Sequence, residues 1–227
     1  MYTKKIRIIY TLALLLIAIN ANGQRRYCDT YEDFLEGRWM ELDTIHVTCH
    51  RKNLEVWEGG NIYTMTTGNK DTDKILKKKA FAVMLADTLY VNCRNLRYEK
   101  QGFGNGYAKG RRIGERSILI VNKIIGQDAN VNQFMSGFMF GLIGSAITAS
   151  QQMKQQVCYI ISSGADNQGE IPIRLISDDL MDLMIVRHDD LRKEFFEEKK
   201  ASKRILAKRV IPLLEKAGLF EQYKKTE

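Results

Sequence analysis

Short strand-like segments follow one another through the first half of the chain. Runs rich in β-branched and aromatic residues alternate with turn signals such as Glu58-Gly59-Gly60-Asn61 and Ala86-Asp87. The predicted strands are Thr44–Cys49, Leu54–Trp57, Ile62–Thr66, Ala80–Leu85, Thr88–Leu96 and Ser117–Lys123. Strands joined by connections this short pair as antiparallel neighbours. The pattern therefore predicts an antiparallel sheet, with Lys77-Lys78-Lys79 as a solvated basic segment before one of its strands.

Helical signals flank these strands. Thr30 and Asp33 form a weak capping box for one or two helical turns that end at Gly37. After a strand pair at Cys158–Ser162 and Glu170–Ile176, Ser177 is a good N-cap for a further helix. Two more helices are predicted at Asp189–Lys200 and Ser202–Ala217, the second kinked at Pro212 and stopped at Gly218. The expected fold class is α+β.

The N-terminus has the three parts of a secretory signal peptide. Lys4, Lys5 and Arg7 precede an apolar run of twelve residues, Ile8–Ile19, and small residues lead to Gln24. The run is shorter than the roughly 20 residues that a membrane-spanning helix needs. We expect a signal peptide at 1–23, a mainly antiparallel β domain at 24–176 and a C-terminal helical segment at 177–227. The expected location is the periplasm, the outer membrane or the extracellular medium.

The charge balance argues against nucleic acid as a partner. The whole chain carries a formal charge of +8, and removal of the three N-terminal cations with residues 1–23 lowers it to +5. A charge of this size suits general solubility better than phosphate-backbone binding. The ligand and the partner stay unknown at this stage, and we expect no cofactor.

Four cysteines could form disulfides in an oxidising compartment. They are Cys28, Cys49, Cys93 and Cys158. Four cysteines allow three connectivities, and the alternative is one disulfide or none with the remaining thiols buried as small apolar side chains. No C-x-x-C pair is present, so we expect no zinc ribbon and no thioredoxin-like site. His46 and His50 lie on one predicted strand face about 13 Å apart, too far to share a metal ion.

A glycine-rich stretch from Gly102 to Gly110 precedes a pair of arginines. Its backbone amides with Lys109, Arg111 and Arg112 could hold an anion. The stretch matches neither phosphate-loop fingerprint and leads into a strand. The alternative interpretation is a flexible or strand-bending loop.

Residues 129–153 carry no charge, and their centre predicts a helix at 134–150. Gly137, Gly141, Gly144 and Ser145 fall within one narrow arc of that helix, opposite bulky apolar residues. Each glycine costs about 1 kcal/mol of helix propensity, so the small-residue arc indicates close approach of another backbone. In one interpretation that backbone belongs to the sheet of the same domain. In the other, residues 134–149 insert into a membrane or pair with a copy of themselves.

The order of parts resembles a group of small exported proteins of unknown function from Gram-negative bacteria. The segments that carry the resemblance are the Ala21–Gln24 exit, Asp33–Leu35, Ala80–Val83, Asp87–Asn92 and Gly102–Tyr107, followed by the glycine-rich helix and the charged helical tail. Such proteins have no established activity, so the resemblance implies no catalytic residue.

These observations favour an exported protein that acts by binding or by association with the envelope rather than by catalysis. No G-x-S-x-G nucleophile elbow, metal spacing or nucleotide fingerprint is present. The alternatives are membrane association through 134–149 and a secreted hydrolase that leaves no sequence motif.

Overall fold

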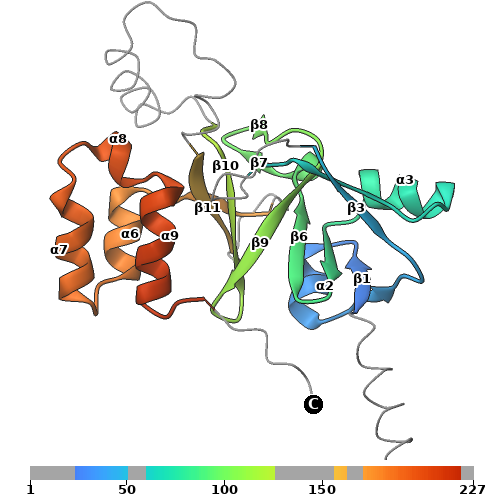
Figure 1. The fold of residues 1–227 in the computed structure, drawn as a ribbon, viewed down its shortest axis with the longest axis horizontal. Helices are drawn as coiled ribbons and strands as arrows, with labels where there is room; N and C mark the ends of the chain where they lie inside the picture. Colours follow the sequence, from blue (N-terminus) through green and yellow to red (C-terminus); the bar gives the residue numbers. More distant parts are fainter. Residues whose placement is uncertain (1–23, 51–59, 126–155, 163–170, 221–227) are drawn as a thin grey trace, which may run out of the picture.

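A computed structural model describes residues 24–50, 60–125, 156–162 and 171–220. These residues form a ten-stranded antiparallel sheet in the order β12-β11-β10-β9-β6-β5-β1-β2, with β4 joining β9 and β3 pairing with β4. Figure 1 shows the sheet in the middle of the molecule, with α6–α9 at one end and α3 at the other. Sheet and helices are both substantial, which confirms the α+β class.

The strands are short at the ends of the sheet and longest in its centre. Their bounds are β1 Arg25–Cys28, β2 Met40–Glu41, β3 His46–Cys49, β4 Tyr63–Thr66, β5 Ala82–Leu85, β6 Thr88–Asn92, β9 Tyr107–Ile113, β10 Ser117–Lys123, β11 Gln156–Ser162 and β12 Ile173–Leu175. A separate small hairpin consists of β7 Arg97–Tyr98 and β8 Gln101–Gly102.

Three of the six described α-helices, α2, α3 and α6, begin at a residue whose side chain caps the N-terminus. The bounds of the six helices are α2 Tyr31–Glu36, α3 Lys70–Lys78, α6 Asp178–Met184, α7 Asp189–Glu197, α8 Ala201–Arg204 and α9 Ala207–Lys216, with a short 3₁₀ helix η1 at Cys93–Asn95. The predicted capping box of α2 is present, and Gly37 ends that helix in the left-handed conformation. Ser177 accepts from the Leu180 amide, as its N-cap position requires.

The sheet buries both of its faces. We call the face that carries Val91, Ala108, Ile120 and Tyr159 the inner face, and its core is closed by α2 and the aromatic Phe103. The opposite, outer face has two separate cores. One lies between β10, β11 and helices α6, α7 and α9, and the other lies between β4, β5, β6 and α3. Strand β9 runs between the two outer cores (Figure 1).

Gly110 allows side chains of the neighbouring strands to pack tightly over β9 on the inner face. A Cβ at this position would lie 3.0 Å from methyl groups of Ile118 and Val91 and 3.2 Å from Leu89. Side chains from β6 and β10 therefore occupy the space in front of the glycine.

Several predicted elements agree with the structure. Strand β10 has the predicted bounds, and β3, β4, β5 and β11 fall within or next to the predicted segments. Ala86 adopts a positive φ of 50° between β5 and β6, which fits the predicted Ala86-Asp87 turn.

Two predictions were wrong, and one helix was not predicted. The basic residues Lys77–Lys79 are exposed, as expected, but they lie at the end of the unpredicted helix α3, whose N-terminus is capped by Asn69 and whose Leu76 is buried. Strand β6 ends at Asn92, whose side chain accepts from the Arg94 amide and starts η1.

The predicted Ser202–Ala217 helix is the second error. It divides into α8 and α9 around Leu206, which forms a β-bridge with Val157. Helix α9 continues through Pro212 and ends before Gly218, which has a positive φ of 66°.

Other predictions lie outside the described residues. They are the signal peptide at 1–23, the strand Leu54–Trp57 and the glycine-rich helix at 134–150 with Gly137, Gly141, Gly144 and Ser145. Within the part of the chain that the structure describes, every helix is too short or too polar to cross a bilayer.

Candidate functional site

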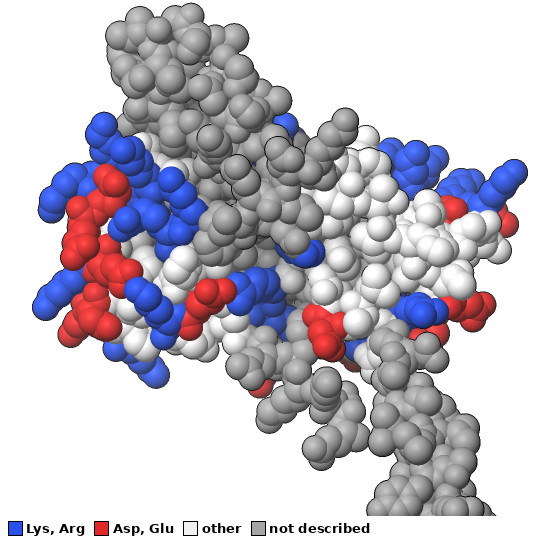
Figure 2. All heavy atoms as spheres, viewed as in Figure 1, with Lys and Arg blue, Asp and Glu red and all other residues white. Residues whose placement is uncertain are grey.

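Two cations of the predicted anion site lie on the outer face of β9. Lys109 and Arg111 are separated by one residue on the strand, so their side chains point to the same face, about 7 Å apart. Figure 2 shows Lys and Arg atoms in the middle of this face, between the helical end and the α3 end of the molecule. We call Lys109 and Arg111 the β9 cation row.

Each cation of the row lies over an aromatic ring. The Lys109 ammonium is 5.6 Å from the centre of the Tyr63 ring. Tyr63 is itself held edge-to-face by Tyr90 at 5.2 Å, and Tyr90 pairs with Lys109 across β6 and β9. Partial burial lowers the pKa of Lys109 from its ordinary value. These contacts fix a lysine that would otherwise sample many rotamers.

Arg111 links the sheet to the C-terminal helix. Its guanidinium carbon lies 3.6 Å from the centre of the Phe220 ring, and its Nη1 donates to Glu215 Oε1 at 2.6 Å. The Arg111 and Glu215 side chains are 42% and 48% exposed, so water screens this ion pair. An incoming anion can therefore compete with Glu215 for the arginine.

Arg112 does not join the row, which corrects the three-residue anion site expected from the sequence. It follows Arg111 on the strand, so it points to the inner face, where its guanidinium carbon lies 4.6 Å from the centre of the Phe34 ring. Lys109, Arg111 and Arg112 belong to a strand, not to a glycine loop. Applying the two-residue period of a strand to the sequence would have separated Arg112 from the other two.

The glycine segment before β9 has a packing role in the structure. Phe103 is buried and contacts the Tyr159 ring edge-to-face at 4.9 Å. Gly104 and Gly106 have φ values of 94° and 99°. The Asn61 side chain donates to the Asn105 carbonyl at 2.5 Å, and a Cβ on either glycine would collide with Asn61. The glycines therefore let this segment pass close to Asn61.

The sequence alone did not reveal the groups that frame the row. Tyr63, Tyr90, Glu215 and Phe220 come from three distant parts of the chain, and only the sheet register and the position of α9 bring them to β9. Of these, only the strand partner Tyr90 could be reached from sequence, through the pairing of neighbouring strands.

All four cysteines are free thiols in the structure. Cys28, Cys93 and Cys158 are buried, and Cys49 is partly exposed at the end of β3. Burial raises the pKa of Cys28 and of Cys93 to about 12, because the thiolate would lose its hydration. The structure thus contains four separate thiols, three of them shielded from solvent.

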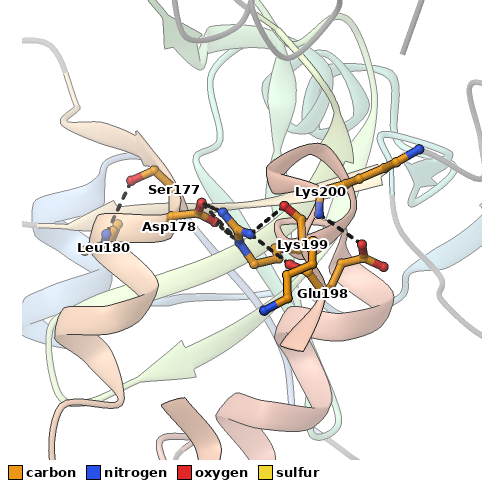
Figure 3. A network of polar contacts seen from close by, with 7 residues as sticks. Ser177, Asp178, Leu180, Glu198, Lys199 and Lys200 are labelled. Atoms are coloured by element: carbon orange, nitrogen blue, oxygen red, sulfur yellow. Dashed lines mark hydrogen bonds and ion pairs between the residues drawn. The ribbon is translucent and has the colours of Figure 1, made fainter. Parts of the chain in front are cut away.

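A second polar network ties the helices together and has a structural role. Arg204 donates through Nε and Nη2 to the carboxylate of Asp178 at the start of α6. Its Nη1 donates to the carbonyls of Glu198 at 2.8 Å and Lys199 at 3.2 Å (Figure 3). The arginine therefore joins the N-terminus of α6 to the turn between α7 and α8.

The described residues contain no group of three His, Cys, Asp or Glu side chains placed to hold a metal ion. His50, one of the two strand histidines, forms a hydrogen bond through Nε2 with the Thr64 hydroxyl at 2.9 Å.

A comparison with known protein families identifies the family of this chain. The profile of a family of unknown function (DUF6563) matches residues 26–221, which include the sheet, the β9 cation row and the C-terminal helices. The chain belongs to this family. The DUF6563 assignment agrees with the expected family of unknown function, and the family description names no activity. No curated protein and no solved structure matches the chain.

Proposed function

We propose that this member of the DUF6563 family is an exported protein that acts by binding, without catalysis, and that it recognises an anionic partner at the β9 cation row. The observation that carries the proposal is the shared orientation of Lys109 and Arg111, each held over an aromatic ring on the outer face. Rings that hold two cations in place lower the entropy lost on binding.

The spacing of the row suits an extended acidic partner. Alternate side chains of an extended peptide lie about 7 Å apart, as do Lys109 and Arg111 on β9. The row lies on a strand and not at a helix N-terminus, so its charge comes from side chains and its affinity should fall with salt. Export rests on the N-terminal segment, where three cations precede the apolar run Ile8–Ile19.

The anionic partner can be tested with a fluorescent hexaglutamate peptide and anisotropy at low salt. We expect K109Q/R111Q to weaken binding about three- to tenfold, because two screened charge contacts are lost. The matched control K77Q/K78Q removes the same charge from α3 and should bind as the wild type does. E215Q should strengthen binding, because it removes the carboxylate that competes for Arg111. Equal weakening in both double variants would refute recognition at the row.

Export has its own test. In a Gram-negative host, the full chain should appear in the periplasmic, outer-membrane or extracellular fraction, with a mature N-terminus at Gln24. An uncleaved chain that remains in the cytoplasm would contradict export without bearing on the β9 cation row.

A second candidate function is membrane or self-association through 134–149, with Gly137, Gly141, Gly144 and Ser145 as its contact face. One observation favours it: β10 and β11 pair continuously from Ser117 opposite Ser162 to Lys123 opposite Gln156. The two strands that flank the connection containing the uncharged segment therefore pair up to its ends, at Lys123 and Gln156. A hairpin whose strands pair up to that point does not need the segment to set its register.

This candidate predicts that the segment can be removed. Replacement of residues 126–155 by a short Asn-Gly turn should leave a cooperatively folding protein with an unfolding free energy close to that of the wild type. The replaced protein should lose sedimentation with vesicles or dimer formation. Loss of folding would instead show that the glycine-rich segment belongs to the core of the domain.

A further inference from the structure

Two arginines and two aromatic rings meet on the inner face next to α2. The Arg26 guanidinium carbon lies 4.9 Å from the centre of the Trp39 ring. Trp39 contacts Phe34 edge-to-face at 6.0 Å, and Arg112 lies over Phe34 at 4.6 Å. We call Arg26, Trp39, Phe34 and Arg112 the rim cluster.

The sheet register brings these residues together from distant parts of the sequence. Arg26 on β1 lies opposite Met84, whose side chain belongs to the inner core. Arg112 on β9 lies opposite Ile118 of the same core. Helix α2 covers this end of the inner face with Phe34, and the chain after Gly37 adds Trp39. Both arginines therefore approach α2 from the sheet.

One donor of the Arg26 guanidinium, Nε, has no hydrogen-bond partner among the described residues. Its Nε is buried, and within the described ranges no acceptor lies within hydrogen-bond distance of that atom. The neighbouring Arg25 differs, because its Nη1 donates to the Asp43 carbonyl at 2.9 Å. A buried guanidinium donor without an acceptor is costly unless a ligand or water supplies one.

Two of the three acidic groups of α2, those of Asp33 and Glu36, are already engaged. Asp33 accepts from the Thr30 hydroxyl at 2.8 Å and from Arg38 Nε at 2.7 Å. Glu36 forms an ion pair with Arg38. These carboxylates are therefore not available to neutralise the charge of Arg26.

We propose that the rim cluster binds a compact oxyanion, a carboxylate or phosphate group, through the guanidinium of Arg26, with Arg112 adding positive charge. A guanidinium held over an indole ring loses less freedom when it binds, and its planar fork of donors matches the two oxygens of a carboxylate or phosphate. The ring pair Trp39–Phe34 sets the separation of the two arginines. The site lies on the opposite face of the sheet from the β9 cation row and does not depend on it.

Trp39 supplies the signal for a direct test. The chain has two tryptophans, Trp39 and Trp57, so W57F leaves Trp39 as the one tryptophan fluorophore. In that background, titration with inorganic phosphate and, separately, with succinate at constant ionic strength should change the emission and reach saturation. Saturation by phosphate alone or by succinate alone supports the site and identifies the source of the oxyanion.

Four variants make the test specific. R26Q should weaken binding about tenfold or more, since it removes a charge-assisted bidentate contact. R25Q, the matched control with the same charge change on the same strand, should bind as the parent does, and R26K should recover only part of the affinity. K109Q/R111Q should also bind as the parent does, which separates this site from the β9 cation row.

Three results would overturn the proposal. The first is the absence of saturation with both phosphate and succinate in a protein that melts cooperatively. The second is equal weakening by R25Q and R26Q, which would indicate a general charge effect. The third is the same emission change with sodium chloride at matched ionic strength.

Discussion

At the residue scale, the direction of each β9 side chain determines which face of the sheet carries its charge. Lys109 and Arg111 face outward, and Gly110 and Arg112 face inward. One strand thus contributes a cation row on one face, and on the other a packing position and an arginine of the rim cluster. The residue types were visible in the sequence, but the division between faces depended on recognising Tyr107–Ile113 as a strand.

Gly110 should tolerate no side chain. We expect Gly110→Ala to lower the free energy of unfolding by about 1–3 kcal/mol and Gly110→Val to lower it by more. The reason is that the added Cβ alone would already lie 3.0 Å from methyl groups of Val91 and Ile118. Urea unfolding measures the change. Gly102→Ala is the matched control, since its new Cβ would meet only the end of the flexible Arg97 side chain. A Gly110→Ala protein as stable as Gly102→Ala would contradict the packing described here.

The buried thiols should make the protein labile to alkali. The pKa of Cys28 and of Cys93 is raised to about 12 from an ordinary value of 9.0. The folded state therefore retains protons that the unfolded state releases between about pH 9 and pH 12. The resulting stability is fully present below pH 9 and is lost as the pH rises, by up to about 1.4 kcal/mol per pH unit for each thiol.

Urea unfolding between pH 8 and pH 10.5 tests this dependence. Cys93→Ala should flatten the fall in unfolding free energy above pH 9, although it lowers stability at neutral pH by emptying a packed site. Cys49→Ala is the control, because it removes a thiol that is partly exposed. Parallel pH profiles for the wild type and Cys93→Ala would show that burial of this thiol does not govern the alkaline loss.

At the element scale, helices α6–α9 are held by packing and by Arg204. Its side chain is 14% exposed and that of Asp178 is 27% exposed, so water screens this pair less than it screens Arg111 and Glu215. The same guanidinium satisfies two carbonyls at the α7–α8 turn. Removal of the arginine therefore leaves one carboxylate and two carbonyls without their donor.

We expect Arg204→Ala to cost about 2–4 kcal/mol of unfolding free energy, because a partly buried network loses its central donor. Arg204→Lys should recover only part of this, since a lysine cannot satisfy the carboxylate and both carbonyls together. Thermal and urea unfolding measure both variants. Arg192→Ala, which breaks the more exposed pair with Asp182, is the control and should cost less. Equal losses of unfolding free energy in Arg204→Ala and Arg192→Ala would show that the Arg204 contacts stabilise the protein no more than an exposed ion pair does.

Elements with strong local signals could be predicted from the sequence, and elements decided by tertiary contacts could not. The capping box of α2 and the continuous apolar run of β10 are local, and both agree with the structure. The three lysines at the end of α3 are exposed as expected, but the helix was not predicted, because it depends on capping by Asn69 and on burial of Leu76. The break at Leu206 arises from its bridge to Val157, a contact about fifty residues away in sequence.

At the scale of the whole molecule, one sheet carries two cation clusters on opposite faces. The sheet itself separates them, and β9 contributes to both. None of this arrangement follows from composition, because a formal charge of +8 says nothing about where the cations gather. The DUF6563 family assignment covers the same sheet and helices.

The most direct test of the account compares two adjacent residues of β9. R111Q and R112Q each remove one positive charge from neighbouring positions, but from opposite faces of the sheet. In hexaglutamate anisotropy titrations at low salt, with R26Q present in every protein so that the rim cluster cannot bind the carboxylates, and with folding confirmed by melting, we predict that R111Q weakens binding about two- to fivefold and that R112Q leaves it unchanged. Equal loss in the two variants, or no loss in R111Q, would contradict anion recognition at the outer face of β9.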